Sequence, residues 1–168
     1  ISEIDRTFTR EKAVSGREDD TLADLEDIAE EAEIKLDRNY TRNVNISDIL
    51  KEGESLLVQV SKEPINAKGP KLTTCFSLPG RFVILMPNIP KIGISKKIID
   101  FDERKRLKDI ILSVLPEESG CIIRTTSEGK ADSEILADLH YLLGVWNDIK
   151  NKYNQVENFT CIYKDIDL

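Results

Sequence analysis

The stretch "NAKGPKLTTCFSLPGRFVILMPN", residues 66–88, sets the fold class of this chain. "NAKGP" is rich in turn-forming residues, and "KLTTCFSL" at 71–78 has the composition of a strand. "PGR" then interrupts the strand pattern, and "FVILMP" at 82–87 is apolar throughout, as expected of a buried strand. Together with "SLLVQVSKE" at 55–63, these residues predict a β-hairpin followed by a third strand.

The same stretch lies in a basic island of an acidic chain. The formal net charge is −7 at pH 7, whereas residues 61–97 carry seven lysines and arginines against Glu63 alone, a net charge of +6. Glycine-punctuated strands that bear lysines suit a polyanion such as single-stranded RNA or DNA. Lysines also protect an exposed edge strand from aggregation, so charge alone leaves a nucleic-acid surface and a solvated edge both open.

Composition is typical of a globular protein. The chain has 168 residues, 40% of them hydrophobic and 33% charged, which suffices for one domain or two small ones. No apolar run approaches the roughly 18 residues of a transmembrane segment, and no signal-peptide pattern opens the chain. Cys75, Cys121 and Cys161 are too widely spaced to form a metal-ligand pair, which predicts reduced thiols in a cytoplasmic protein.

An acidic segment at about 10–44 interrupts the β-rich region. Within it, "DTLADLEDIAEEAEIKL" has apolar residues at helical spacing over 21–36. We therefore expect a helix-bearing surface insertion.

Beyond residue 97 the pattern changes to alternating strands and helices. The expected elements, in order, are a short strand at 93–98, a helix at 103–115, a strand at 120–126, a longer helix and a strand at 158–166. Asp102 is expected to cap the first helix, and Asp132 or Ser133 the second. This mixture of elements predicts an α+β fold.

A candidate anion site lies in "CIIRTTSEGK", residues 121–130. Arg124 and Thr125 end a buried strand there, and Gly129 precedes the start of a helix. Guanidinium and hydroxyl donors beside a helix N-terminus suit a phosphate. The alternative is a strand end at which the threonines satisfy turn hydrogen bonds and Arg124 pairs with a surface carboxylate.

No group of residues suggests catalysis. His140 is expected to be a half-exposed helix residue, and Trp146 to pack in the core. Carboxylates concentrate in the insertion and on helix faces, where a solvated role is the default. We therefore predict no catalytic residue and no metal site in this chain.

Three linked motifs resemble the N-terminal part of the ribonuclease E/G family, which comprises bacterial and plastid endoribonucleases that cut single-stranded RNA. The motifs are "KEPINAKGPKLTT", "SLPGRFVILMP" followed by "GISKK", and "IIRTTSEGK". The resemblance runs from about residue 45 to 150. It implies a partial S1-type OB-fold β-barrel over 1–82, whose first strands would precede Ile1, and a small α/β 5′-sensor module over 83–168.

The resemblance also implies site residues. In the family the S1 module binds RNA, and the sensor module recognises the 5′-monophosphate of the substrate. Lys68 matches the RNA-contacting lysine, and Lys71 lies near it. By position, the residues that would hold the 5′-phosphate are Gly80, Ile84, Arg124 and Thr125.

The resemblance implies a larger enzyme around this chain. The catalytic Mg²⁺ site of the family, and the cysteines that share Zn²⁺ between subunits, would lie beyond Leu168, so this chain is not expected to cleave RNA alone. We expect single-stranded RNA with a 5′-monophosphate as its partner, no DNA, and a homo-oligomeric parent. The alternative is a non-catalytic OB-fold scaffold that uses the acidic helix at 21–36 as its contact surface.

Overall fold

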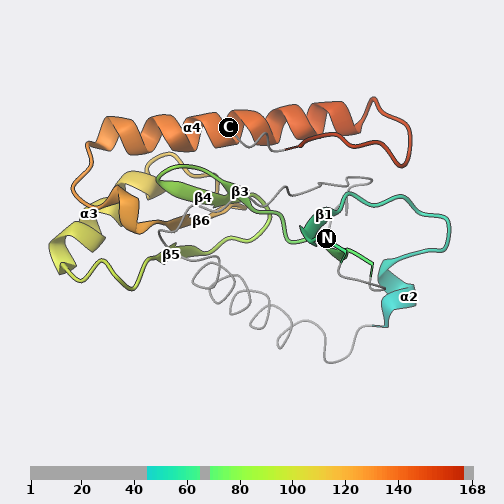
Figure 1. Cartoon of the computed structure of the whole chain (residues 1–168), viewed down its shortest axis with the longest axis horizontal. Coiled ribbons are helices and arrows are strands. Elements are labelled where there is room, and N and C mark those ends of the chain that lie inside the picture. Colours follow the sequence, from blue (N-terminus) through green and yellow to red (C-terminus); the bar gives the residue numbers. More distant parts are fainter. Residues whose placement is uncertain (1–44, 65–68, 165–168) are drawn as a thin grey trace. The chain divides into compact units, whose positions relative to one another are not determined.

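The computed structural model describes residues 45–64 and 69–164 (Figure 1). These residues belong to two compact units: residues 45–64, 69–76 and 148–164 form the first, and residues 77–147 form the second. The acidic helix expected at 21–36 lies outside the described residues. The domain boundary expected after residue 82 remains a prediction.

A two-stranded hairpin provides the β structure of the first unit. β1 (Gln59–Lys62) pairs antiparallel with β2 (Lys71–Thr73), and Lys62 lies opposite Lys71. A bulge after Val60 shifts the register between the strands. The predicted hairpin is confirmed, although both strands are shorter than expected.

The short helix α2 (Ile46–Ile49) and residues 148–164 complete the first unit. The Ser55 hydroxyl donates to Asn158 Oδ1 over 2.8 Å, which joins two parts of the unit that are 103 residues apart in sequence. The strand expected at 158–166 is wrong over 158–164, the part of it that the structure describes, because these residues contain no strand. Ile162 is nevertheless buried, which accounts for the apolar character of this stretch.

A four-stranded mixed sheet forms the centre of the second unit. Its spatial order is β3 (Leu78–Pro79), β4 (Val83–Met86), β6 (Gly120–Ile123) and β5 (Ile92–Ile94). β4 runs antiparallel to both of its neighbours, whereas β5 is parallel to β6. Every residue of β4 and β6 is buried, which explains why both strands are apolar without alternation.

Three expected strands have different limits in the structure. The strand expected at 71–78 is wrong as one element, since bends at Thr74 and Cys75 separate β2 from β3. The strand expected at 93–98 corresponds to β5 and ends at Ile94. The strand expected at 120–126 ends at Ile123, and its threonines belong to the 3₁₀ turn η1 (Thr125–Ser127).

The helix α3 (Phe101–Leu112) connects the parallel strands β5 and β6. Its N-cap is Asp100, whose carboxylate accepts the Glu103 N–H at 2.7 Å. The expected cap, Asp102, is wrong because that residue already lies in the first helical turn. The helix forms because its buried residues, Leu107 and Ile111, are one turn apart and share a face.

The helix α4 (Asp132–Tyr153) follows η1 and runs along the sheet of the second unit (Figure 1). Its buried residues in this unit are Ile135, Leu139 and Leu142, at the spacing of one helix face. Asp132 is already helical, so neither Asp132 nor Ser133 precedes the helix as the expected cap. Instead, the Ala131 N–H donates to the carboxylate of Glu134 over 3.3 Å.

The α+β class predicted from the sequence is confirmed. The described strands of the first unit form an open hairpin, so the S1-type barrel remains a prediction. Among the described residues, no helix has both the length and the apolar character needed to span a membrane.

Candidate anion-binding site

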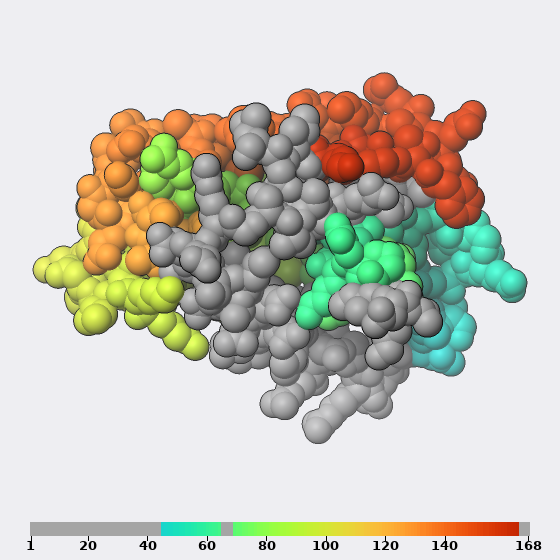
Figure 2. Space-filling view, in the orientation of Figure 1, coloured from blue at the N-terminus to red at the C-terminus, as the bar shows by residue number. Residues whose placement is uncertain are grey.

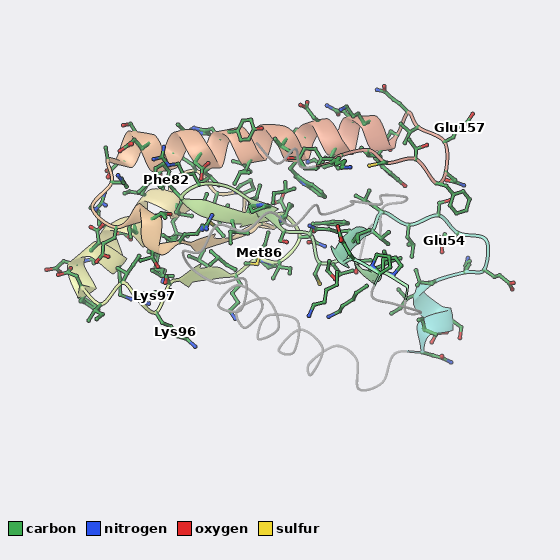
Figure 3. All side chains as sticks on the ribbon, viewed as in Figure 1. Glu54, Phe82, Met86, Lys96, Lys97 and Glu157 are labelled. Atoms are coloured by element: carbon green, nitrogen blue, oxygen red, sulfur yellow. The ribbon has the colours of Figure 1, made fainter. Side chains whose placement is uncertain are left out.

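Three loops of the second unit meet at one end of its sheet. β5 and β6 are parallel, so the residues after Ile94 and after Ile123 emerge at the same end, and the antiparallel β4 begins there. Figure 3 shows Phe82, Lys96 and Lys97 toward this end and Met86 toward the other. The carboxyl ends of parallel strands are where α/β sheets bind ligands. We call this end, with its three loops at 80–82, 95–97 and 124–127, the loop edge.

Arg124 is held at the loop edge by both its backbone and its side chain. Its N–H donates to the Phe82 carbonyl at 2.9 Å, and its Nη1 donates to the Gly80 carbonyl at 2.8 Å. The guanidinium is therefore fixed by the loop between β3 and β4. Its Nε is buried and has no hydrogen-bond partner, and it is the one such side-chain nitrogen or oxygen that the described residues contain. A buried donor without an acceptor costs about 1–3 kcal/mol, which an added oxygen acceptor would recover.

Thr125 lies next to Arg124 and is oriented by the loop after β5. Its hydroxyl shares a 2.9 Å hydrogen bond with the Ser95 hydroxyl. The Ser95 N–H donates to the Ile123 carbonyl at 2.9 Å, and the Ser95 carbonyl accepts from Arg104 Nη1 at 2.8 Å. The hydroxyl pair is thus anchored to both β6 and α3.

Asp138 of α4 contacts the loop at 80–82 from its other side. Its carboxylate accepts the backbone N–H groups of Arg81, Phe82 and Val83 at 3.2, 2.8 and 3.1 Å. A Cβ on Gly80 would lie 2.5 Å from Asp138 Oδ2, so a larger residue here would have to displace this carboxylate or the loop. In Figure 2 green atoms of this loop lie among orange atoms of the segments after residue 120.

A network of charged residues fixes the turn between η1 and α4. Gly129 has a φ of 68°, and its N–H donates to Glu103 Oε1 at 2.9 Å. Arg106 bonds both carboxylate oxygens of Glu103 at 2.7 Å and also pairs with Asp132. The Arg106 guanidinium, with the Gly129 N–H, lowers the pKa of Glu103 to about 2.

The structure brings together three of the residues expected to hold a phosphate. Gly80, Arg124 and Thr125 all lie at the loop edge, and the first two are directly hydrogen-bonded. Ile84 is in the middle of the sheet instead, paired with Pro79 and Ile122, and its side chain is 4% exposed.

Neither of the two lysines expected to bind RNA is a described residue of the second unit. Lys71 is an exposed residue of β2 in the first unit, and Lys68 lies outside the described residues. His140, expected to be half-exposed, is exposed on α4. Among the described residues, no cluster of three or more His, Cys, Asp or Glu side chains is placed to hold a metal ion.

The residues that hold Arg124 and Thr125 in place were not identified from the sequence. Ser95 stands in the "GISKK" motif but was given no role, and Arg104 and Asp138 are single polar residues within expected helices. The parallel pairing of β5 with β6 is the one signal that would have brought Ser95 to the site. Nothing in the sequence distinguishes Asp138 from the other carboxylates of its helix.

A known family matches residues 77–147 of the second unit and the residues that follow them to the end of the chain. The sequence model of the ribonuclease E/G family matches residues 77–168. The chain is also 35% identical over 124 residues to ribonuclease G of Escherichia coli strain K12, which covers 74% of this chain and 25% of that protein. The chain belongs to the ribonuclease E/G family.

Two ribonuclease E proteins are similar over a comparable region. That of Haemophilus influenzae is 45% identical over 107 residues, or 63% of this chain and 11% of that protein. That of Buchnera aphidicola is 41% identical over 131 residues, or 76% of this chain and 13% of that protein. The chain therefore spans about a quarter of the length of its ribonuclease G relative, and less of these ribonuclease E relatives.

Proposed function

We propose that this chain is the part of a ribonuclease E/G-type endoribonuclease that binds single-stranded RNA and recognises its 5′-monophosphate. The terminal phosphate would bind at the loop edge, where Arg124 supplies a guanidinium and Thr125 a hydroxyl. Charge-assisted hydrogen bonds from a guanidinium are well suited to phosphate. The observation that carries the proposal is the placement of Arg124, which the Gly80 carbonyl fixes and whose Nε has no acceptor among the described residues.

Positive charge at the same end of the sheet supports an anionic ligand. Lys96 and Lys97 are exposed in the loop after β5, and Arg81 is exposed in the loop before β4. The Arg81 guanidinium lies 5.0 Å from the centre of the Phe82 ring, which orients it by a cation–π contact. Cations from two loops thus accompany Arg124 in the second unit.

The hairpin of the first unit supports contact with the RNA backbone. Lys62 and Lys71 are exposed and directly opposite each other across β1 and β2. Two exposed lysines side by side on a hairpin present the positive charge that suits the phosphates of an RNA backbone. We propose that this hairpin belongs to a partial S1-type barrel in which Lys68 and Lys71 follow the RNA backbone.

Cleavage itself is proposed for parts of the enzyme beyond Leu168. There, Mg²⁺ would activate water for attack on the phosphodiester, and a shared Zn²⁺ would link subunits of a homo-oligomer. In this chain, recognition of the RNA end would contribute binding and positioning.

A binding experiment tests the proposal. Two single-stranded RNAs that differ only in a 5′-monophosphate or 5′-hydroxyl, each labelled at the 3′ end, are titrated with the chain by fluorescence anisotropy. We expect the phosphorylated RNA to bind about tenfold more tightly, with this preference lost in Arg124→Ala and reduced in Arg124→Lys. Lys108→Ala serves as the charge-matched control, because it removes one positive charge from an exposed position of α3.

The outcomes separate the proposal from a general polyanion surface. Equal binding of the two RNAs by the wild type would refute recognition of the terminal phosphate. A preference that survives Arg124→Ala would refute the assignment of Arg124. A loss of preference in Lys108→Ala as well would indicate that overall charge, and not the pocket, determines binding.

A further inference from the structure

Three consecutive peptide groups connect Asp138 to the segment that carries Arg124. On one side, the N–H groups of Arg81, Phe82 and Val83 all donate to the Asp138 carboxylate, at 2.8–3.2 Å. One carboxylate thus satisfies three successive donors of the loop between β3 and β4.

The carbonyl groups of the same three peptides bind the segment at 124–127. The Gly80 carbonyl accepts from Arg124 Nη1 at 2.8 Å, and the Arg81 carbonyl accepts from Thr126 Oγ1 at 2.7 Å. The Phe82 carbonyl accepts two hydrogen bonds, from Arg124 N at 2.9 Å and from Ser127 Oγ at 2.6 Å. Each of these three carbonyl groups therefore accepts a hydrogen bond from residues 124–127, which follow β6.

The geometry of the peptide bond links the two sets of contacts. In a trans peptide the N–H and C=O groups point in opposite directions. A carboxylate that fixes the N–H groups on one side of the loop therefore aims the carbonyls toward the other side. Charge on the acceptor also polarises each peptide, which strengthens the hydrogen bond that its carbonyl accepts.

We infer that Asp138 is a positioning residue for phosphate recognition, acting on Arg124 through the peptide groups of residues 80–83. This inference rests on the function proposed above. Asp138 fixes the Gly80 carbonyl, the Gly80 carbonyl fixes the guanidinium, and the guanidinium meets the phosphate.

A role by charge alone predicts the opposite effect. A carboxylate near an RNA-binding surface repels phosphate, so its removal would raise affinity for both RNAs. A role in folding alone predicts lower stability with no change in the ratio of the two affinities. Only positioning predicts a selective loss of the 5′-phosphate preference.

The test compares substitutions of Asp138 with a control on the same helix. Asp138→Asn keeps the side-chain shape but leaves one oxygen to accept three N–H groups, and Asp138→Glu keeps the charge but displaces the carboxylate. Asp148→Asn removes the same charge from an exposed position of α4. The full 168-residue chain is titrated with the 5′-phosphate and 5′-hydroxyl RNAs, and thermal melting monitored by circular dichroism confirms that each variant is folded at the assay temperature.

We expect Asp138→Asn and Asp138→Glu each to reduce the 5′-phosphate preference about five- to tenfold, with binding of the 5′-hydroxyl RNA unchanged. Asp148→Asn should keep the preference. If the wild type prefers the phosphorylated RNA and both Asp138 variants keep that preference, the positioning role is refuted while the proposed function stands. If the wild type shows no preference, the proposed function itself fails. Should Asp138→Asn unfold, Asp138→Glu alone decides, since it retains the charge and an oxygen acceptor.

Discussion

Gly80 and Asp138 approach so closely that a methyl group on Gly80 would lie 2.5 Å from Asp138 Oδ2. This contact brings the loop between β3 and β4 against α4, and the same loop holds the guanidinium of Arg124. Two residues 58 positions apart in sequence thus determine the shape of the candidate phosphate site.

Gly80→Ala should disturb both stability and recognition. The added methyl group must displace the Asp138 carboxylate or the loop, so we expect a loss of about 1–3 kcal/mol in the free energy of unfolding. Gly144→Ala is the control, because Gly144 lies within α4 and a Cβ there would have no neighbour within 4 Å. It should stabilise the chain by about 0.5–1 kcal/mol. Urea denaturation measures both, and a neutral or stabilising Gly80→Ala would contradict the packing described here.

The hydroxyl pair of Ser95 and Thr125 should contribute to phosphate recognition. Thr125→Val keeps the side-chain shape but removes the hydroxyl that bonds to Ser95 and would bond to phosphate. We expect the 5′-phosphate preference to fall about three- to tenfold. Thr125→Ser retains the hydroxyl and should restore most of the preference in the same titration. Equal effects of the two substitutions would show that the hydroxyl has no part in binding.

Glu103 should make stability depend on pH at the acidic end. The Arg106 guanidinium and the Gly129 N–H lower the pKa of Glu103 from 4.5 to about 2. The stabilisation by this carboxylate is therefore complete above about pH 4.5 and disappears as the pH falls through about 2. At pH 7 we expect Glu103→Gln to cost about 1 kcal/mol, since its ion pairs are partly exposed.

The measurement is the difference in unfolding free energy between wild type and Glu103→Gln at pH 7 and at lower pH. That difference should shrink as the pH approaches 2. Glu118→Gln, at an exposed position after α3, should show little effect at either pH. A difference between wild type and Glu103→Gln that stays constant with pH would contradict the assignment.

The cysteines should differ sharply in reactivity. Burial, with a smaller effect from the Asp138 charge, raises the pKa of the Cys121 thiol to about 12. Cys121 therefore stays protonated in the folded protein, whereas Cys161 is exposed. At pH 8 we expect a thiol reagent such as 5,5′-dithiobis(2-nitrobenzoate) to label Cys161 in the native state and Cys121 only after denaturation. Rapid native labelling of Cys121, identified by peptide mass spectrometry, would contradict its burial.

The sequence predicted the central elements of the second unit because their signals are local. β4 and β6 are uninterrupted apolar runs, and α3 and α4 repeat apolar residues at helical spacing. The secondary-structure predictions are wrong where tertiary contacts override the local pattern of residue types. Residues 71–78 divide between two units, and residues 158–164 bury Ile162 without forming a strand.

The candidate site was predicted in part for a related reason. Arg124 and Thr125 could be named from their place at the end of a buried strand, whereas Gly80 was named only from the family resemblance. Ser95 and Asp138 reach the same place only through strand pairing and helix packing. A carboxylate that serves as an acceptor for backbone N–H groups has no sequence signature, and Asp138 resembles a solvated helix residue until the fold is known.

The Nε–Hε resonance of Arg124 in a ¹⁵N-labelled chain tests the central claim most directly. This N–H has no acceptor in the part of the chain that the structure describes, and its signal is identified by its loss in Arg124→Lys. On addition of 5′-phosphorylated RNA we predict a downfield proton shift that saturates with binding, whereas 5′-hydroxyl RNA of the same sequence leaves the resonance in place. A resonance that responds equally to both RNAs, or to neither, would contradict recognition of the terminal phosphate by Arg124.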